Sequence, residues 1–254
     1  MKARSQVKIF DYSYKPRYIT RGNNNKNIFG MEIETEFINN DKVEYFEQFN
    51  EADYRNQIYL KKDSSLDNGL EIITQPASYD FINSTKFKLW KFIKEIQCCC
   101  NSFNKITCGM HIHIDKHAFN NRLHLLKFIS FFQCNYNKIV KHISERKDKI
   151  KLKHYCSNIR KQNINQSLDG NYRTRFIACN VTYSTIEVRI FQANLRKQRI
   201  LKNIEFVQCL INYTASQPNL KLSKSFAKFK KYLVLNKLKY ANLYNFLILN
   251  DKTI

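Results

Sequence analysis

Three segments of the chain alternate apolar with charged or polar residues, which is the period of a β-strand with one buried face. They are residues 30–37, 108–115 and 185–191. If the first segment is a strand, Glu32, Glu34 and Glu36 share one face. The second segment carries two histidines and an aspartate in the same way, and the third places Glu187 beside Arg189. We therefore predict three strands that each present chemically active groups on one face and apolar groups on the other.

Other apolar patterns predict the remaining elements. Two apolar runs on either side of Asp67-Asn68-Gly69 predict a β-hairpin with a tight Asn-Gly turn. Apolar spacings of three and four residues predict a helix that starts at Asn83 or Ser84, a longer one around 125–139, and another around 200–211. Residues 147–166, dense in Lys, Arg and Asn, predict a loop or lid.

The order of these elements predicts an α+β fold with a largely antiparallel β-sheet, the site on one sheet face and helices packed on the other. We predict three parts along the chain. They are a basic lead-in over 1–26, a catalytic domain over 27–216, and a basic extension of short helices over 217–254.

Composition supports a globular protein, because 43% of the 254 residues are hydrophobic and 25% are charged. No apolar run approaches the roughly 18 residues of a membrane span, and the first residues lack a secretory signal pattern. These features predict a cytoplasmic, soluble protein with no membrane partner. The eight cysteines do not form paired Cys-x-x-Cys motifs, so we expect reduced thiols and no structural zinc.

The net charge of +22 has two explanations. Clustered Lys and Arg residues can neutralise the phosphates of a nucleic acid. An A/T-rich gene would also encode this mixture of abundant Lys, Asn, Ile, Phe and Tyr with few Gly and Pro. A basic nucleic-acid-binding protein, or a metal-dependent nuclease, is therefore the alternative function.

The candidate chemistry comes from residues that occur together. Glu32 and Glu34 are costly to bury unless a cation pairs with them, although a solvated strand face explains them equally well. Glu71 could pair with a lysine across the hairpin, and Asp63 could simply form a turn. Taken singly, His111 and His113 are more often half-buried histidines than metal ligands.

Phosphoryl transfer needs carboxylates that hold a metal and cations that face phosphates. Together with the carboxylates above, Glu187, Arg189 and Arg175 supply both kinds of group. No Walker loop, Gly-rich dinucleotide motif or Gly-x-Ser-x-Gly elbow is present, so side chains and metal on the sheet would hold a nucleotide.

Four motifs in order resemble a known family. They are Gly30-Met31-Glu32-Ile33-Glu34, Asp63-Ser64-Ser65-Leu66 with Glu71-Ile72 and Pro76, Cys108-Gly109-Met110-His111-Ile112-His113, and Arg175…Asn180 followed by Thr185-Ile186-Glu187-Val188-Arg189. The pattern, which spans about residues 27–195, is similar to that of the amidoligases, carboxylate–amine ligases related to glutamate–cysteine ligase and glutamine synthetase.

The resemblance implies a glutamine-synthetase-like or glutamate–cysteine-ligase-like fold and an ATP-dependent ligase that forms an amide or peptide bond through an acyl phosphate. By position, Mg²⁺ or Mn²⁺ would be held by four glutamates: Glu32, Glu34, Glu71 and Glu187. The catalytic residues would be Arg189, Arg175 and His111. The nucleotide would be bound by Arg189, His113, Asp63 and Asn180. The other substrates would be a carboxylate and an amine that the motifs do not identify, and an acidic peptide or protein would suit a basic surface.

The chain departs from the family pattern at three places, which are Ser64, Gln75 and Ala193-Asn194-Leu195. None of these positions is an implied metal ligand. Because they lie in loops on the substrate side, substrate identity does not transfer from the family.

Overall fold

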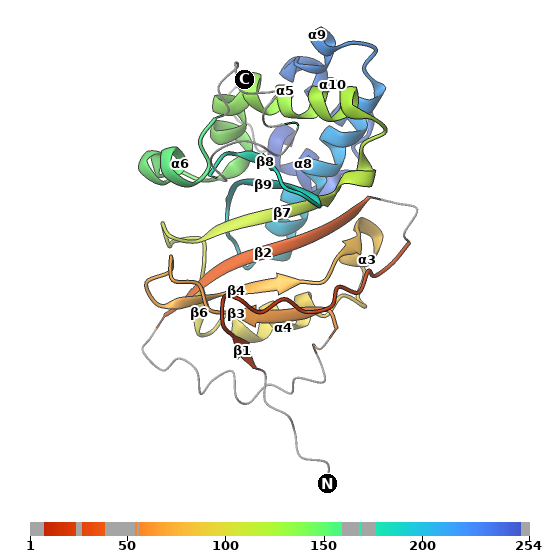
Figure 1. The fold of residues 1–254 in the computed structure, drawn as a ribbon. Coiled ribbons are helices and arrows are strands. Elements are labelled where there is room, and N and C mark those ends of the chain that lie inside the picture. The colour runs from red at the N-terminus through yellow and green to blue at the C-terminus, as the bar shows by residue number, and fades with distance from the viewer. Residues whose placement is uncertain are drawn as a thin grey trace. The chain divides into compact units, whose positions relative to one another are not determined.

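The structure is a computed structural model that describes residues 8–23, 27–38, 54, 56–158, 168 and 176–249. It is an α+β fold with a mixed, mostly antiparallel sheet and several helices, which confirms the predicted class (Figure 1). The strands are β1 (Ile9–Phe10), β2 (Ile28–Phe37), β3 (Ile58–Lys61), β4 (Gly69–Thr74), β5 (Ala77–Ser78), β6 (Cys100–Asn101), β7 (Gly109–Asp115), β8 (Cys179–Val181) and β9 (Thr185–Gln192).

Helices follow the strands in both halves of the chain. The α-helices are α3 (Tyr79–Asn83), α4 (Leu89–Ile96), α5 (Arg122–Ile139), α6 (Lys149–Tyr155), α8 (Lys197–Ser216), α9 (Leu220–Ser223), α10 (Phe226–Leu235) and α11 (Ala241–Tyr244). A 3-10 turn, η1 (Lys116–Ala118), and two π-helical turns, η2 (Val140–Ser144) and η4 (Asn245–Leu249), complete the set.

The chain divides into two compact units. The first unit comprises residues 1–111 and 192–197, and the second comprises 112–191 and 198–254. This division interleaves segments that are distant in the sequence. The domain boundaries predicted at residues 26 and 216 stay a prediction.

In the first unit, the strand order is β1-β3-β4-β2, and β3 and β4 form the predicted hairpin. β4 pairs antiparallel with both β3 and β2, and β1 runs parallel to β3. The two ends of β2 also pair with the short strands β5 and β6. The ten residues of β2 are thus paired with β4 and, near the two ends, with β5 and β6. This pairing fixes the directions in which the β2 side chains project.

The core of the first unit forms because its strands and α4 each have an apolar face. Ile33 of β2 and Ile72 of β4 are opposite one another and fully buried. On α4, four buried residues recur at helical spacing, and they are Leu89, Phe92, Ile93 and Ile96. The single tryptophan, Trp90, is partly buried on α4, and its indole N–H donates to the Ile82 carbonyl at 2.7 Å.

Three sequence-based details of this unit were wrong. The helix predicted to start at Asn83 or Ser84 starts at Leu89, because Ser84 instead caps the end of the separate short helix α3. The basic lead-in over 1–26 contains the short strand β1, which the sequence analysis did not predict. The hairpin is confirmed, but its loop covers seven residues, 62–68, instead of a tight Asn-Gly turn.

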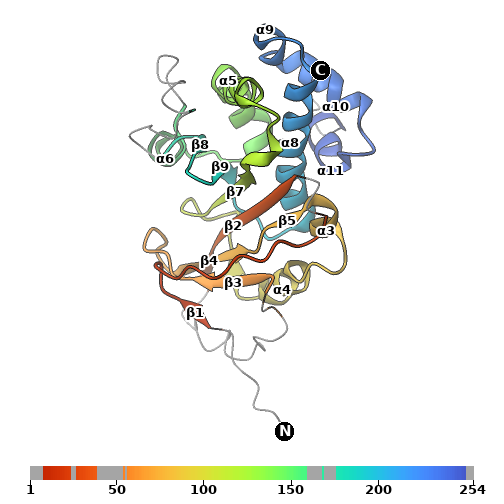
Figure 2. The ribbon, with the colours of Figure 1, turned by 45° about the vertical axis from the view of Figure 1, so that its right-hand side comes forward.

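In the second unit, β9 lies between β7 and β8 (Figure 2). α5 and α8 pack on each other through the rings of Phe132 and Phe206, whose centroids are 5.9 Å apart. α5, α8 and the short helices after residue 217 confirm three sequence predictions. The segment predicted as a loop or lid over 147–166 contains α6 instead, and residues 159–166 of it lie outside the described residues.

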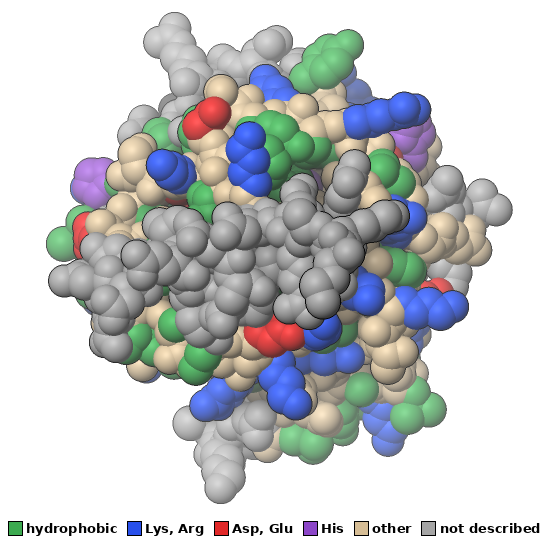
Figure 3. Space-filling model, turned by 90° about the horizontal axis from the view of Figure 1, so that it is seen from below, with side chains coloured by type: hydrophobic (Ala, Val, Ile, Leu, Met, Phe, Trp, Pro, Cys, Tyr) green, Lys and Arg blue, Asp and Glu red, His purple; other side chains and the backbone are tan. Residues whose placement is uncertain are grey.

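Surface features bear on the function classes. On the face in Figure 3, Lys and Arg side chains of the described residues lie among hydrophobic and neutral groups, and several of them gather below the grey region. All eight cysteines are free thiols, as predicted. None of the helices in the described part of the chain has the length and apolar character that crossing a membrane requires.

Candidate functional site

The strand register brings carboxylates of the first unit onto one face. Glu34 of β2 is opposite Glu71 of β4, and Glu32 is opposite Ile73. Because residues opposite one another project from the same side of a sheet, Glu32, Glu34 and Glu71 share that side. This is the alternation that the sequence predicted, with Glu71 now added from the neighbouring strand.

Asp63 joins this group from the loop after β3. One oxygen of each of Glu34, Asp63 and Glu71 lies within 4.8 Å of the other two, a spacing that can hold a metal ion. Glu34 and Glu71 are only 6% and 5% exposed. Asp63 Oδ1 accepts the Ser65 N–H at 2.7 Å, which fixes the aspartate within its loop.

The carboxylates of this cluster repel one another. Burial raises the pKa of Glu71 to about 9, and repulsion from Glu32, Asp63 and Glu34 adds to that shift. Lys61 is opposite Glu71 in the hairpin, but its ammonium lies over the Tyr12 ring, 4.7 Å from the centroid. A divalent cation bound among Glu34, Asp63 and Glu71 would favour the ionised carboxylates and remove this repulsion.

His111, the first histidine of β7, borders the cluster. Its Nδ1 is 3.1 Å from Glu32 Oε2, and its Nε2 is 3.8 Å from Glu34 Oε1. The Gly109 N–H of the same strand donates to Glu34. The Cys-Gly-x-His segment therefore orients two of the three β2 glutamates.

Glu36, the third glutamate of β2, is bound differently. Its carboxylate pairs with Lys105 at 3.3 Å and accepts a hydrogen bond from the Thr107 hydroxyl. A protein cation already satisfies this carboxylate, so Glu36 has a structural role and is not a metal candidate.

In the second unit, the predicted Glu187 and Arg189 form a buried ion pair on β9. The Asn180 amide of β8 donates to Glu187 Oε2 at 3.2 Å, and Arg189 Nε donates to the Tyr155 carbonyl at 3.4 Å. Asn180, Glu187 and Arg189 are thus brought together as predicted motif partners. The convergence of Glu187 with the glutamates of the first unit stays a prediction.

The remaining predicted site residues are His113 and Arg175. His113 Nδ1 lies 3.3 Å from the Thr185 hydroxyl within the second unit. Arg175 lies outside the described residues.

Sequence reasoning missed Arg146, which is buried beside the Glu187–Arg189 pair. Its guanidinium donates to the Arg189 carbonyl at 3.4 Å and contacts Cys156 Sγ at 3.8 Å. It therefore supports the backbone of β9. No sequence signal singles it out, because it is one basic residue in a segment rich in them.

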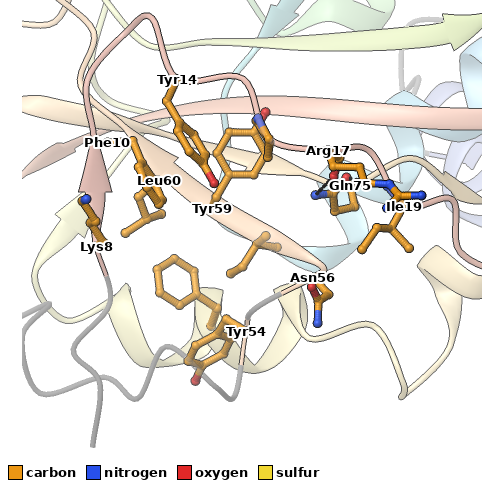
Figure 4. Close-up of a pocket in the computed structure, with 13 residues that line it drawn as sticks. Lys8, Phe10, Tyr14, Arg17, Ile19, Tyr54, Asn56, Tyr59, Leu60 and Gln75 are labelled. Atoms are coloured by element: carbon orange, nitrogen blue, oxygen red, sulfur yellow. Dashed lines mark hydrogen bonds between the residues drawn. The ribbon is translucent and has the colours of Figure 1, made fainter.

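A cavity of about 440 Å³ lies beside β1 and β3 in the first unit (Figure 4). Its described walls carry aromatic rings, including Tyr14 and Tyr59, and two cations, Lys8 and Arg17, but no Asp or Glu. Tyr59 is opposite Ile73, so it projects from the carboxylate face of the sheet. Burial raises the pKa of Tyr59, and repulsion from Tyr18, Glu32 and Glu71 raises it further.

Comparison with protein families adds an independent finding. The sequence profile of a family described as "putative amidoligase enzyme" matches residues 26–179, which is more than half of the chain. The chain belongs to this amidoligase family. Membership indicates a ligase. Among curated proteins, none matches this chain.

The amidoligase match separates the candidate residues into two groups. Its span includes the Gly-x-Glu-x-Glu strand, the Asp63–Glu71 hairpin and the Cys-Gly-x-His-x-His strand. It ends at residue 179, before Glu187 and Arg189. The carboxylate cluster of the first unit therefore lies wholly within the part of the chain that defines the amidoligase family.

Proposed function

We propose that this amidoligase is an ATP-dependent carboxylate–amine ligase that forms an amide or peptide bond through an acyl-phosphate intermediate. The observation that carries the proposal is the cluster of the buried Glu34 and Glu71 with the half-buried Asp63, whose mutual repulsion a divalent cation would relieve. Magnesium bound by a few carboxylates keeps positions free for water and phosphate oxygens, which is the usual arrangement for Mg-ATP.

The reaction would proceed in two displacements. A substrate carboxylate oxygen attacks the γ-phosphorus of ATP, and the bond to the leaving ADP breaks. The amine nitrogen then attacks the acyl carbon, the carbon–oxygen bond to phosphate breaks, and the amine gives up a proton. Mg²⁺ bound at the cluster would supply charge neutralisation for the phosphates.

The protein residues have distinct proposed tasks. Glu34, Asp63 and Glu71 would hold Mg²⁺, with Glu32 and Glu187 as further ligands. His111 would position Glu32 and Glu34 through its two ring nitrogens. Arg189 and Arg175 would face the phosphates or the acyl phosphate, and Asn180 and His113 would contact the nucleotide. The cavity beside Tyr59 offers space for the organic part of a substrate.

Calorimetric titration with ATP tests the proposal. We expect the wild type to bind ATP only when Mg²⁺ is present. Glu34→Gln should weaken this binding at least about tenfold, because loss of groups around a metal commonly costs that much affinity. Glu36→Gln is the matched control, since it makes the same change on the same strand face at a carboxylate that pairs with Lys105.

Three results would overturn the proposal. They are the absence of nucleotide binding in a folded wild-type sample, binding that does not depend on Mg²⁺, and equal affinity in the Glu34 and Glu36 variants. If the expected pattern is found, a screen of carboxylate and amine pairs for ADP release identifies the substrates.

A further inference from the structure

The C-terminal helices of the second unit carry charge of one sign only. Residues 217–249 contain seven lysines and no Asp or Glu. The lysines are Lys221, Lys224, Lys228, Lys230, Lys231, Lys237 and Lys239. This segment is therefore more uniformly cationic than the chain as a whole, which has 21 acidic residues.

α10 is anchored by one face and exposes apolar side chains on the other. Phe226, Phe229 and Leu233 are buried on the inner face, and the Phe229 ring lies 5.2 Å from that of Phe131 in α5. On the outer face and in the turn that follows, Leu235 is 84% exposed and Leu238 is 90% exposed. A single exposed leucine is ordinary, but exposed apolar side chains that lie next to one another commonly mark an interaction surface.

Lysines and apolar residues are ordered along this outer face. Lys230 precedes Val234, and Lys231 precedes Leu235, by four residues each, so each lysine lies one helical turn behind an apolar side chain. These four residues and Ile248 of η4 line a shallow groove of about 430 Å³. We call Lys230, Lys231, Val234, Leu235, Lys237, Leu238 and Ile248 the leucine–lysine surface. Figure 2 shows where α10 and α11 lie on the ribbon.

We propose that the leucine–lysine surface binds the face of a lipid bilayer that contains anionic lipids. Leucines at the end of a helix can enter the boundary between headgroups and acyl chains, while lysines one turn behind reach the lipid phosphates. The absence of acidic residues from 217–249 makes the charge complementary to anionic headgroups.

A bilayer suits this surface better than an acidic peptide does. A bound peptide helix needs a groove deep enough to surround its apolar residues, whereas the groove on this surface is shallow. Here the two most exposed leucines project from the helix end and the turn, where a deformable bilayer can cover them. The expectation of no membrane partner considered spanning segments, and this surface would lie on a membrane without crossing it. The inference does not depend on the ligase reaction.

Co-sedimentation of the full chain with vesicles tests the proposal. We expect binding to phosphatidylcholine vesicles that contain about 30% phosphatidylserine, weaker binding to pure phosphatidylcholine, and loss of the difference as salt screens the charges. The double substitution Leu235→Ser and Leu238→Ser should lower the partition coefficient at least about tenfold, because each leucine loses its apolar burial.

Matched controls locate the effect. Leu123→Ser removes an exposed leucine of α5, which is 50% exposed, and should leave vesicle binding unchanged. Lys231→Glu with Lys237→Glu should abolish the preference for anionic vesicles. All these side chains are exposed, so circular dichroism should show folded variants.

Either of two results would overturn the proposal. One is that the wild type fails to bind anionic vesicles at low salt, even if it binds a polyglutamate peptide. The other is that the leucine double variant binds them as well as the wild type, which would mean that net charge alone attracts the protein.

Discussion

At the scale of single residues, the side chains around each glutamate of β2, and not its position in the strand, determine whether it is a candidate metal ligand. Glu34 and Glu36 occupy equivalent positions two residues apart on one strand face. Glu36 meets Lys105 and Thr107, whereas Glu34 meets Glu71, Asp63 and His111. Alternation in the sequence predicted the shared face, but it could not distinguish the two environments, because Lys105 and Asp63 come from loops with no periodic pattern.

The raised pKa of Glu71 predicts that the metal-free protein becomes less stable as pH rises. In the folded state Glu71 keeps its proton up to about pH 9, whereas in the unfolded chain it ionises near pH 4.5. The folded state therefore binds more protons between these values, and raising the pH there favours unfolding. We expect urea unfolding in EDTA to give a free energy that falls by about 1 to 3 kcal/mol between pH 5 and pH 8.

Glu71→Gln serves as the comparison for this prediction. The variant should lack that part of the pH dependence, while contributions from other groups, such as His124, whose pKa burial lowers, remain in both proteins. A wild type and a variant with the same slope would show that Glu71 does not hold the proton.

At the scale of elements, periodic segments were predictable and their connections were not. The strands that became β2, β4, β7 and β9 and the helices α5 and α8 follow from alternating or helical patterns over several residues. β1 was missed because its two residues are too few to show a period; they form a strand through pairing with β3. The start of α4 was misplaced because Ser84 has good capping chemistry, which the chain uses at the C-terminal end of α3.

The hairpin loop illustrates the same limit. Asn68-Gly69 predicted a tight turn, yet the loop is longer and Gly69 begins β4. The reason for glycine here is close approach between strands, since a Cβ on Gly69 would lie 2.1 Å from the Thr35 carbonyl oxygen of β2.

Gly69→Ala should therefore destabilise the first unit. The contact atom is backbone, so β4 must shift away from β2, and overpacking of this kind costs about 1 to 3 kcal/mol. For a chain of this size we expect the melting temperature to fall by about 2 to 4 °C per kcal/mol. Asn68→Ala is the control, because the Asn68 contact to β2 is its backbone carbonyl, which accepts the Phe37 N–H at 2.9 Å and is retained. An unchanged melting temperature for the glycine variant would contradict the steric argument.

At the scale of the whole molecule, sequence reasoning predicted the fold class and the family but not the division into two units. Two units became visible only in three dimensions, because the first takes residues 192–197 from a region that the sequence assigns to the end of the catalytic motifs. Gln192 shows how this segment is bound, since its amide donates to the carbonyls of Ser102, Lys105 and Cys108.

Binding of Mg-ATP should raise the melting temperature of the protein. If Mg-ATP binds the folded protein, a concentration of 100 times the Kd stabilises it by about 2.7 kcal/mol. We expect a rise in melting temperature of about 5 to 10 °C in differential scanning fluorimetry. ATP with EDTA should give no rise, and Mg-ATP at the same concentration should raise the melting temperature of Glu34→Gln by no more than about half as much as that of the wild type, because a tenfold weaker site is stabilised by about 1.4 kcal/mol or less. A shift of equal size in EDTA would place nucleotide binding somewhere other than the carboxylate cluster.

Trp90 gives this protein an optical label of its own. It is the single tryptophan of the chain, it belongs to the first unit, and its ring is held by the Ile82 carbonyl and lies 5.0 Å from the Lys197 ammonium. Indole emission excited near the red edge of protein absorption therefore originates from the first unit alone, whereas the far-ultraviolet dichroism sums the helices of both. Recording the two signals together distinguishes a chain that melts in one step from one whose halves melt separately, without any dye or engineered fluorophore.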